Sequence, residues 1–210
     1  STSTAAAAGV RATNSIFSRP GATVTGTASS AVDSTSLTGV VLDGGTLAAT
    51  TIMGSATCPN GACRGTQLTG SINTSGATAI SGTVIGTCSS GCRGVQVLPA
   101  TTISDGSATD SLSITGAGLE MGVQVQSSAL TCSGALDVLG QASTNGVLVE
   151  GSTISSNGMV IRGQLAGGFG VRIIQSALVP TGTCQLGDAM INALDVALVD
   201  TSLDLRACSS

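Results

Sequence analysis

The chain has 210 residues and a formal net charge of −4, from seven Arg and eleven acidic residues, and it contains no Lys, His, Trp or Tyr. Only 9% of its residues are charged, and its mean hydropathy is +0.45. This composition excludes intrinsic disorder, which needs low hydrophobicity and high net charge, and it provides no basic patch or aromatic platform for nucleic acid. No apolar run approaches the length of a membrane-spanning helix.

A short phrase recurs eight times along the chain. It consists of a glycine, an aliphatic residue or Thr, a variable residue and a second apolar residue, with a further apolar residue five positions on, as in Gly39 to Leu47 and Gly146 to Ile154. Asp195 replaces the glycine in the last copy. The residues that follow the glycine position are spaced by 30, 26, 29, 28, 24, 24 and 25, and they are Val10, Val40, Thr66, Val95, Val123, Val147, Val171 and Val196. A repeat of this length is typical of a solenoid.

Each repeat predicts about three short strands. The Val-x-Val alternation indicates a strand with one buried face, a second apolar point follows seven residues after the repeat's Val, and a third segment such as 111–116 or 136–140 precedes the next repeat. No stretch shows helical periodicity with caps. We therefore expect an all-β, right-handed parallel β-helix of about eight coils. It would form a single domain over residues 1–210, either complete or one segment of a longer solenoid.

Stacking of successive coils predicts columns of like residues. The eight residues given above should form an inward column, and the preceding glycine should either turn a corner at positive φ or allow close approach of the backbone. The variable residue should face outward, which places Gln67, Gln96 and Gln124 in successive coils. We expect an outward amide ladder there; a sugar-binding row is the alternative.

The seven cysteines indicate an oxidising compartment and hence a secreted chain, extracellular or at the cell surface. We expect two small disulfide loops and one bridge between adjacent coils, with the pairs Cys58–Cys63, Cys88–Cys92 and Cys184–Cys208. A zinc site at the first two pairs is the alternative. Cys132 is then left over, either buried or paired with another chain.

The phrases at 39–47 and 146–154 resemble those of right-handed parallel β-helix proteins of the bacterial surface, such as filamentous-haemagglutinin and autotransporter-passenger regions and secreted β-helix-repeat proteins. The resemblance covers residues 9–205. It implies a role as an adhesin, as a stalk, or as a polysaccharide-cleaving enzyme. Adhesin passengers of this kind are poor in cysteine, unlike this chain, and no individual site residue of the family maps onto it.

Catalysis needs a group that exchanges a proton near the working pH, and without His and Lys only carboxylates and cysteines remain. One local group of acids exists, Asp188, Asp195, Asp200 and Asp204, which could hold a glycosidase dyad but also suits polar turns around the last coil. We expect turn residues, and hence no catalytic residue, no cofactor and no metal site.

The predicted function is a secreted structural or adhesive surface element, not an enzyme. Its open ends should self-associate or join neighbouring solenoid segments, and its polar faces could contact a cell-surface glycan or protein. Two alternatives remain. One is a carbohydrate-active enzyme, a polysaccharide lyase or hydrolase, that uses Asp195 and Asp200. The other is an ice-binding solenoid, for which an ordered Thr-x-Thr array is needed; along the sequence the Thr residues look irregular.

Overall fold

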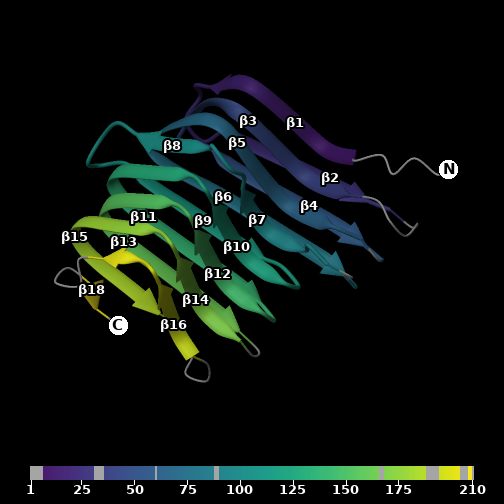
Figure 1. Cartoon of the computed structure of the whole chain (residues 1–210). Helices are drawn as coiled ribbons and strands as arrows, with labels where there is room; N and C mark the ends of the chain where they lie inside the picture. Colours follow the sequence, from purple (N-terminus) through teal and green to yellow (C-terminus); the bar gives the residue numbers. More distant parts are fainter. Residues whose placement is uncertain are drawn as a thin grey trace.

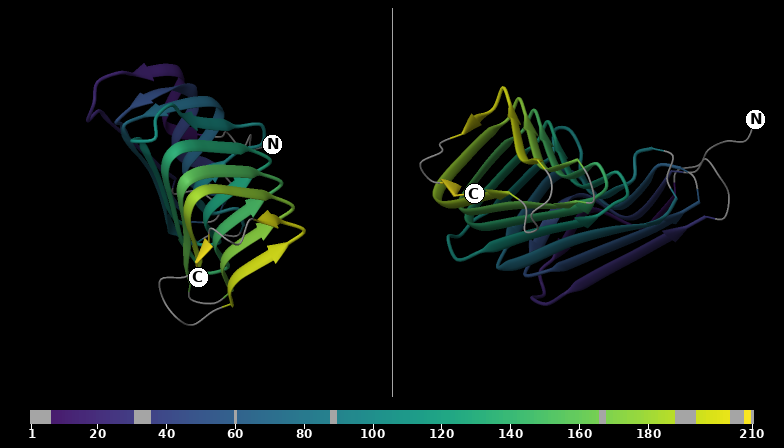
Figure 2. Two further views of the ribbon diagram at one scale, coloured as in Figure 1. Left: turned by 90° about the vertical axis from the view of Figure 1, so that its left-hand side faces the viewer. Right: turned by 90° about the horizontal axis from the view of Figure 1, so that it is seen from below.

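The computed structural model describes residues 7–30, 36–59, 61–87, 90–165, 168–187, 194–203 and 208–209. In this part of the chain all regular structure is β, and every strand pair is parallel. The strands stack as a β-solenoid (Figure 1), which confirms the predicted fold class. Figure 2 shows the same stack from two further directions, with the N-terminal strands at one end and the C-terminal strands at the other.

Each turn of the solenoid has three faces. The first face is built from β1 (Ala7–Phe17), β3 (Leu37–Ala48), β5 (Cys63–Ser75), β7 (Arg93–Val97), β10 (Met121–Gln126), β12 (Asn145–Glu150), β14 (Phe169–Ile174) and β16 (Leu194–Val199). The second face is made by the later parts of β1, β3 and β5 together with β8 (Thr102–Asp105), the starts of β11 (Ala129–Ala142), β13 (Thr153–Leu165) and β15 (Ala177–Gly187), and β17 (Ser202–Leu203). The third face contains β2 (Thr23–Ser29), β4 (Thr51–Cys58), β6 (Ala77–Gly86), β9 (Ser111–Ala117), the later parts of β11, β13 and β15, and β18 (Cys208–Ser209).

The predicted inward column is confirmed at every step. Register pairs join all its members in chain order, from Val10 with Val40 to Val171 with Val196. β-Branched side chains pack well on such a surface, and the five members from Thr66 to Val171 are fully buried. Eight strands share this column, but the first and last of them, β1 and β16, have a neighbour on one side only. The solenoid makes about six turns, slightly fewer than the eight coils that the sequence predicted.

The second inward column departs from the prediction near its start. Ile72, Ile103, Leu130, Ile154, Leu178 and Leu203 lie in register with one another. Leu47, however, pairs with Thr74 and not with Ile72, because the register of β3 and β5 shifts between Asp43 and Gly45. An irregularity of this kind displaces the pairing along the strand.

The glycines of the repeat allow close approach and do not turn corners. None of the glycines from Gly39 to Gly146 that open the phrase has a positive φ. They meet a second, equally regular column of glycines on the third face, in which Gly26, Gly54, Gly82, Gly116, Gly140 and Gly163 are in register. A Cβ added at Gly116 would overlap the backbone of Gly122. We call these two columns the glycine seam; along it the first and third faces touch backbone to backbone.

The glycine seam separates two apolar cores. The main core lies inside the three faces and runs the length of the rod. A small second core lies on the other side of the seam; its described members all belong to the early turns and are Ala28, Leu37, Ala56, Cys58, Cys63, Val84 and Cys92. Each glycine of the third face is followed along the chain by the first-face glycine of the next turn. The two are 13, 11 and 12 residues apart in the early turns, starting at Gly26, Gly54 and Gly82, and 6, 6 and 7 residues apart in the later turns. The extra length of the first three repeats therefore lies largely beyond the seam, whereas the repeat that begins at Gly94 is lengthened before it, between Gly94 and Gly116.

Candidate functional site

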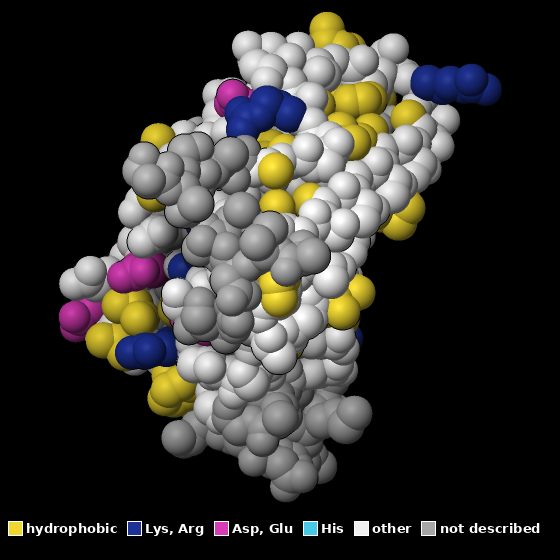
Figure 3. All heavy atoms as spheres, turned by 90° about the vertical axis from the view of Figure 1, so that its right-hand side faces the viewer, with side chains coloured by type: hydrophobic (Ala, Val, Ile, Leu, Met, Phe, Trp, Pro, Cys, Tyr) yellow, Lys and Arg dark blue, Asp and Glu magenta, His cyan; other side chains and the backbone are white. Residues whose placement is uncertain are grey.

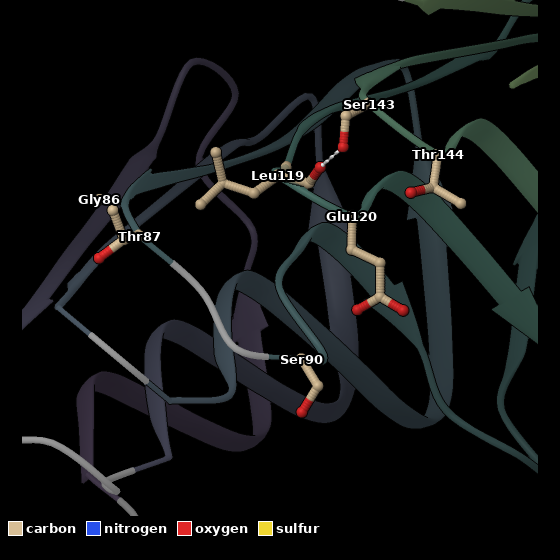
Figure 4. Close-up of a pocket in the computed structure, with 8 residues that line it drawn as sticks. Gly86, Thr87, Ser90, Leu119, Glu120, Ser143 and Thr144 are labelled. Atoms are coloured by element: carbon tan, nitrogen blue, oxygen red, sulfur yellow. Dashed lines mark hydrogen bonds between the residues drawn. The ribbon is translucent and has the colours of Figure 1, made fainter. Parts of the chain in front are cut away.

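One cavity lies at the turns between the third and first faces. It has a volume of about 570 Å³ and is lined by residues of three successive turns: Gly86, Thr87 and Ser90; Gly118, Leu119 and Glu120; and Ser143 and Thr144. Figure 4 shows the Glu120 side chain directed toward the turn that carries Ser90. Glu120 Oε2 accepts a hydrogen bond of 2.5 Å from the Gly91 N–H, and the Ser143 hydroxyl donates to the Leu119 carbonyl. Glu120 is the one ionisable residue among the described residues that line this cavity, so the cavity does not bring a pair of carboxylates together.

The predicted amide ladder is present in part, and it is buried. Gln67, Gln96 and Gln124 are in register, as predicted. Gln96 Nε2 donates to Gln124 Oε1 at 3.0 Å, but Gln96 Oε1 accepts from Arg64 Nε. Gln96 and Gln124 lie on the side of their strands opposite the inward Val95 and Val123, as predicted, but each is only 5% exposed and is not presented to solvent. A buried amide must be hydrogen-bonded, because leaving it unpaired is expensive. The ladder therefore acts as internal polar structure at these two positions, and this argues against a sugar-binding row there.

Arg64 connects this ladder to a second cavity. Its Nη1 donates to Ser36 Oγ at 3.0 Å, and Arg64 lies in register with Arg93 in the next turn. Burial and the neighbouring charge of Arg93 lower the pKa of Arg64. The cavity, of about 310 Å³, is also lined by Arg11 and Gln67. Within the described residues the one ion pair is Arg162–Asp137, so the guanidinium groups at this cavity have no carboxylate partner there.

A ladder of hydroxyl groups runs along the corner between the first and second faces, and the sequence reasoning missed it. Its members are Thr101, Ser128, Ser152, Ser176 and Thr201, each of which follows a residue with positive φ. The Ser128 N–H donates to Ser152 Oγ and the Ser152 N–H to Ser176 Oγ, both at 3.1 Å. The hydroxyls in turn donate to carbonyls near the corner. The sequence does contain a pattern that marks this ladder. In each of the last four repeats a Ser or Thr lies six residues after the first residue of the phrase, and in the repeat that begins at Gly94 it lies seven residues after it.

Replacing Ser152 by Ala is expected to lower the free energy of unfolding by about 1–3 kcal/mol, because the buried Ser128 N–H loses its acceptor. Ser152→Thr should retain most of the stability, since Thr occupies the equivalent corner positions in other turns. Urea unfolding followed by circular dichroism measures both variants. Equal stability of the Ala variant and the parent would contradict this role.

The disulfide predictions are confirmed for one pair. Cys58 and Cys63 form a disulfide, with both residues in the second core; this pair is therefore not a zinc site. Cys92 and Cys184 are also disulfide-bonded, but Cys88 and the side chain of Cys208 lie outside the described residues. The backbone of Cys208 is in register with Cys184, as a bridge between adjacent coils requires.

Cys132 is a free thiol inside the main core, 3% exposed, which agrees with the buried alternative for this residue. Burial, the negative charge of Asp105 and a hydrogen bond from the thiol to the Asp105 carboxylate raise the pKa of Cys132 to about 12. Asp105 Oδ1 also accepts a hydrogen bond from the Ser133 N–H at 2.5 Å. A thiol in such surroundings stays protonated and is a poor nucleophile.

The acidic group near the C-terminus falls mostly outside the described residues. Asp188, Asp204 and the side chain of Asp195 are not described, whereas Asp200 is exposed at a corner with positive φ. Among the described residues no three His, Cys, Asp or Glu side chains gather in a way that could hold a metal ion. The same part of the chain contains no helix that could span a membrane.

Comparison with models of known protein families, with curated proteins and with solved structures gives no match to this chain. The resemblance to filamentous-haemagglutinin and autotransporter-passenger regions therefore stays a prediction. The chain is a parallel β-solenoid in which the glycine seam joins the first and third faces and hydrogen-bonded polar side chains link successive turns.

Proposed function

We propose that the chain is a secreted, non-catalytic structural or adhesive surface element. In this proposal it is a rigid rod that joins neighbouring solenoid segments, or further copies of itself, through its ends. The observation that carries the proposal is the open end of the main core. Leu198 ends a column of inward residues in which Val97, Val125, Val149 and Ile173 are 0% exposed, yet Leu198 itself is 42% exposed.

The strand edges support the same proposal. Among the described residues, β1 pairs only with β3 and β2 only with β4, while at the other end β16 pairs only with β14. Such edges present unpaired backbone groups to which another strand can add. A further turn added beyond β16 would cover Leu198 and continue the hydrogen-bonding pattern.

Secretion and adhesion rest on other features. The Cys58–Cys63 disulfide favours an oxidising compartment. On the side seen in Figure 3, hydrophobic and charged side chains lie in small separate groups among backbone and other side chains. A glycan or protein that carries an anionic group could be held at the cavity of Arg11 and Arg64, because guanidinium groups bind carboxylates and sulfates well.

The end-joining can be tested with one charged substitution and a matched control. The parent chain should form end-to-end assemblies that grow with concentration in light scattering and appear as rods in electron microscopy. Leu198→Asp should suppress assembly, because it places a charge in the contact. Val179→Asp changes a side chain of similar exposure, 46%, on the outer side of the second face and should assemble like the parent.

Two outcomes would contradict the proposal. One is a parent chain that stays a compact monomer at every concentration. The other is assembly that the Asp substitution at Leu198 leaves unchanged.

A further inference from the structure

The outer side of the third face carries a regular array of small polar side chains in its first four turns. The strands β2, β4, β6 and β9 pair without a shift in register, and their outward positions are partly or fully exposed while the inward ones are mostly buried. Three outward columns result: Thr23, Thr51, Ala79 and Ser113; Thr25, Met53, Ser81 and Thr115; and Thr27, Ser55, Thr83 and Ala117. Nine of these twelve positions are Thr or Ser. We call the twelve the hydroxyl array.

The strands that carry the array are held in place by close backbone contacts on their inner side. Gly26, Gly54, Gly82 and Gly116 lie in the middle of the four strands and contact the backbone of the first face along the glycine seam. Neighbouring parallel strands are about 4.8 Å apart, and alternate residues along a strand are about 6.7 Å apart. The hydroxyls therefore occupy a two-dimensional net with these two repeats.

Most hydroxyls of the array are not used by the protein. Ser81 Oγ donates to the Ile52 carbonyl at 3.2 Å; among the described residues, none of the other eight hydroxyls in the array forms a hydrogen bond with the protein. Each Thr also presents a methyl group beside its hydroxyl. The outer surface thus alternates hydrogen-bonding and apolar groups at fixed spacing.

The array carries no charge. The first charged residues farther along this face are Asp137 on β11 and Arg162 on β13, which pair with each other at 3.0 Å. A charged ligand would find no counter-ion in the array, and a soluble sugar would find none of the aromatic platforms that sugar sites often use, since the chain has no Trp or Tyr. A periodic, uncharged lattice of hydrogen-bonding groups is the ligand that matches these properties.

We propose that the hydroxyl array binds the surface of ice. Water molecules held between its hydroxyls and methyl groups would adopt spacings of the size found in the ice lattice, and the protein would adsorb through them. The irregular spacing of Thr along the sequence argued against such an array. Corresponding positions of the array are 28, 28 and 34 residues apart along the chain, and the extra residues before β9 do not disturb its register with β6. This inference does not depend on end-to-end assembly.

Thermal hysteresis, measured together with partition of the protein into a slowly growing ice hemisphere, tests the proposal. The parent chain should show hysteresis and enter the ice. Thr83→Lys should lose most of both, because a long charged side chain in the array separates it from the lattice. Thr153→Lys, the same substitution at an exposed Thr on the second face, should behave like the parent. Thr27→Lys at the exposed edge strand is a second array variant should the first fail to fold.

Absence of hysteresis and of ice uptake in the parent would overturn the proposal. So would equal activity of folded Thr83→Lys or Thr27→Lys and the parent, or an equal loss in Thr153→Lys. End-to-end assembly is measured separately with the Leu198 variant in ice-free solution, so the two ideas can fail independently.

Discussion

Replacing Gly116 by Ala is expected to lower the free energy of unfolding by more than about 3 kcal/mol, a large effect for one methyl group. The added Cβ would overlap the carbonyl of Gly122 and press on the Val123 side chain. The Gly122 backbone cannot retreat alone, because β10 is paired with strands on both sides. Urea unfolding of the oxidised protein, followed by circular dichroism, measures the effect.

Gly106 provides the matched control. It is exposed, and an added Cβ would meet nothing within 4 Å. Gly106→Ala should be neutral, or stabilise the fold by up to about 1 kcal/mol through the reduced freedom of the unfolded chain. If both variants unfold at the same urea concentration, close packing along the glycine seam is not what holds the first and third faces together.

The second large effect is a loss of stability at alkaline pH that depends on Cys132. The pKa of this thiol in the folded chain, about 12, lies above its ordinary value of 9.0. The folded state therefore retains the proton more strongly than the unfolded state. Its contribution to stability is complete below about pH 9 and is lost as the pH rises toward 12, by up to about 1.4 kcal/mol per pH unit. The chain has no His, Lys or Tyr, so few other side chains change charge in this range.

Urea unfolding between about pH 7 and about pH 11, under non-reducing conditions, measures this dependence. Stability should be nearly constant up to about pH 9 and then fall. Cys132→Ser removes the group that titrates and should remove most of the decline. A decline of the same slope in this variant would place its origin elsewhere, for example in the disulfides.

The stacking of the turns could be predicted from the sequence because one strand carries a distinctive phrase in every repeat. Val40, Val95 and Val147 follow a glycine that has its own steric role, so the phrase marks the same point of each turn. Strands of the third face carry only a shorter phrase, a β-branched residue two positions before a glycine, as at Val24–Gly26, and the outward residues around that glycine vary between Thr, Ser, Ala and Met. For this reason the array that contains Thr25 and Thr83 became visible only through strand pairing.

The predicted outward ladder shows a different limit of the sequence. Alternation along a strand tells which side chains share a side, but not whether that side is covered. Gln96 and Gln124 lie on the side opposite Val95 and Val123, as predicted, and are nevertheless buried. Their hydrogen bonds with each other and with Arg64 involve partners 28 and 32 residues away, which no local pattern specifies.

The small second core suggests how this chain can change in length. Because the glycine seam closes the main interior in each turn, the segment between Gly54 and Gly65, or between Gly82 and Gly94, can be lengthened or shortened without altering the packing inside the three faces. In the later turns, whose corresponding segments are about half as long, no described residue belongs to this outer core. New loops could therefore be grafted at these connections, giving the molecule a row of sites where sequence can diversify while the scaffold stays the same.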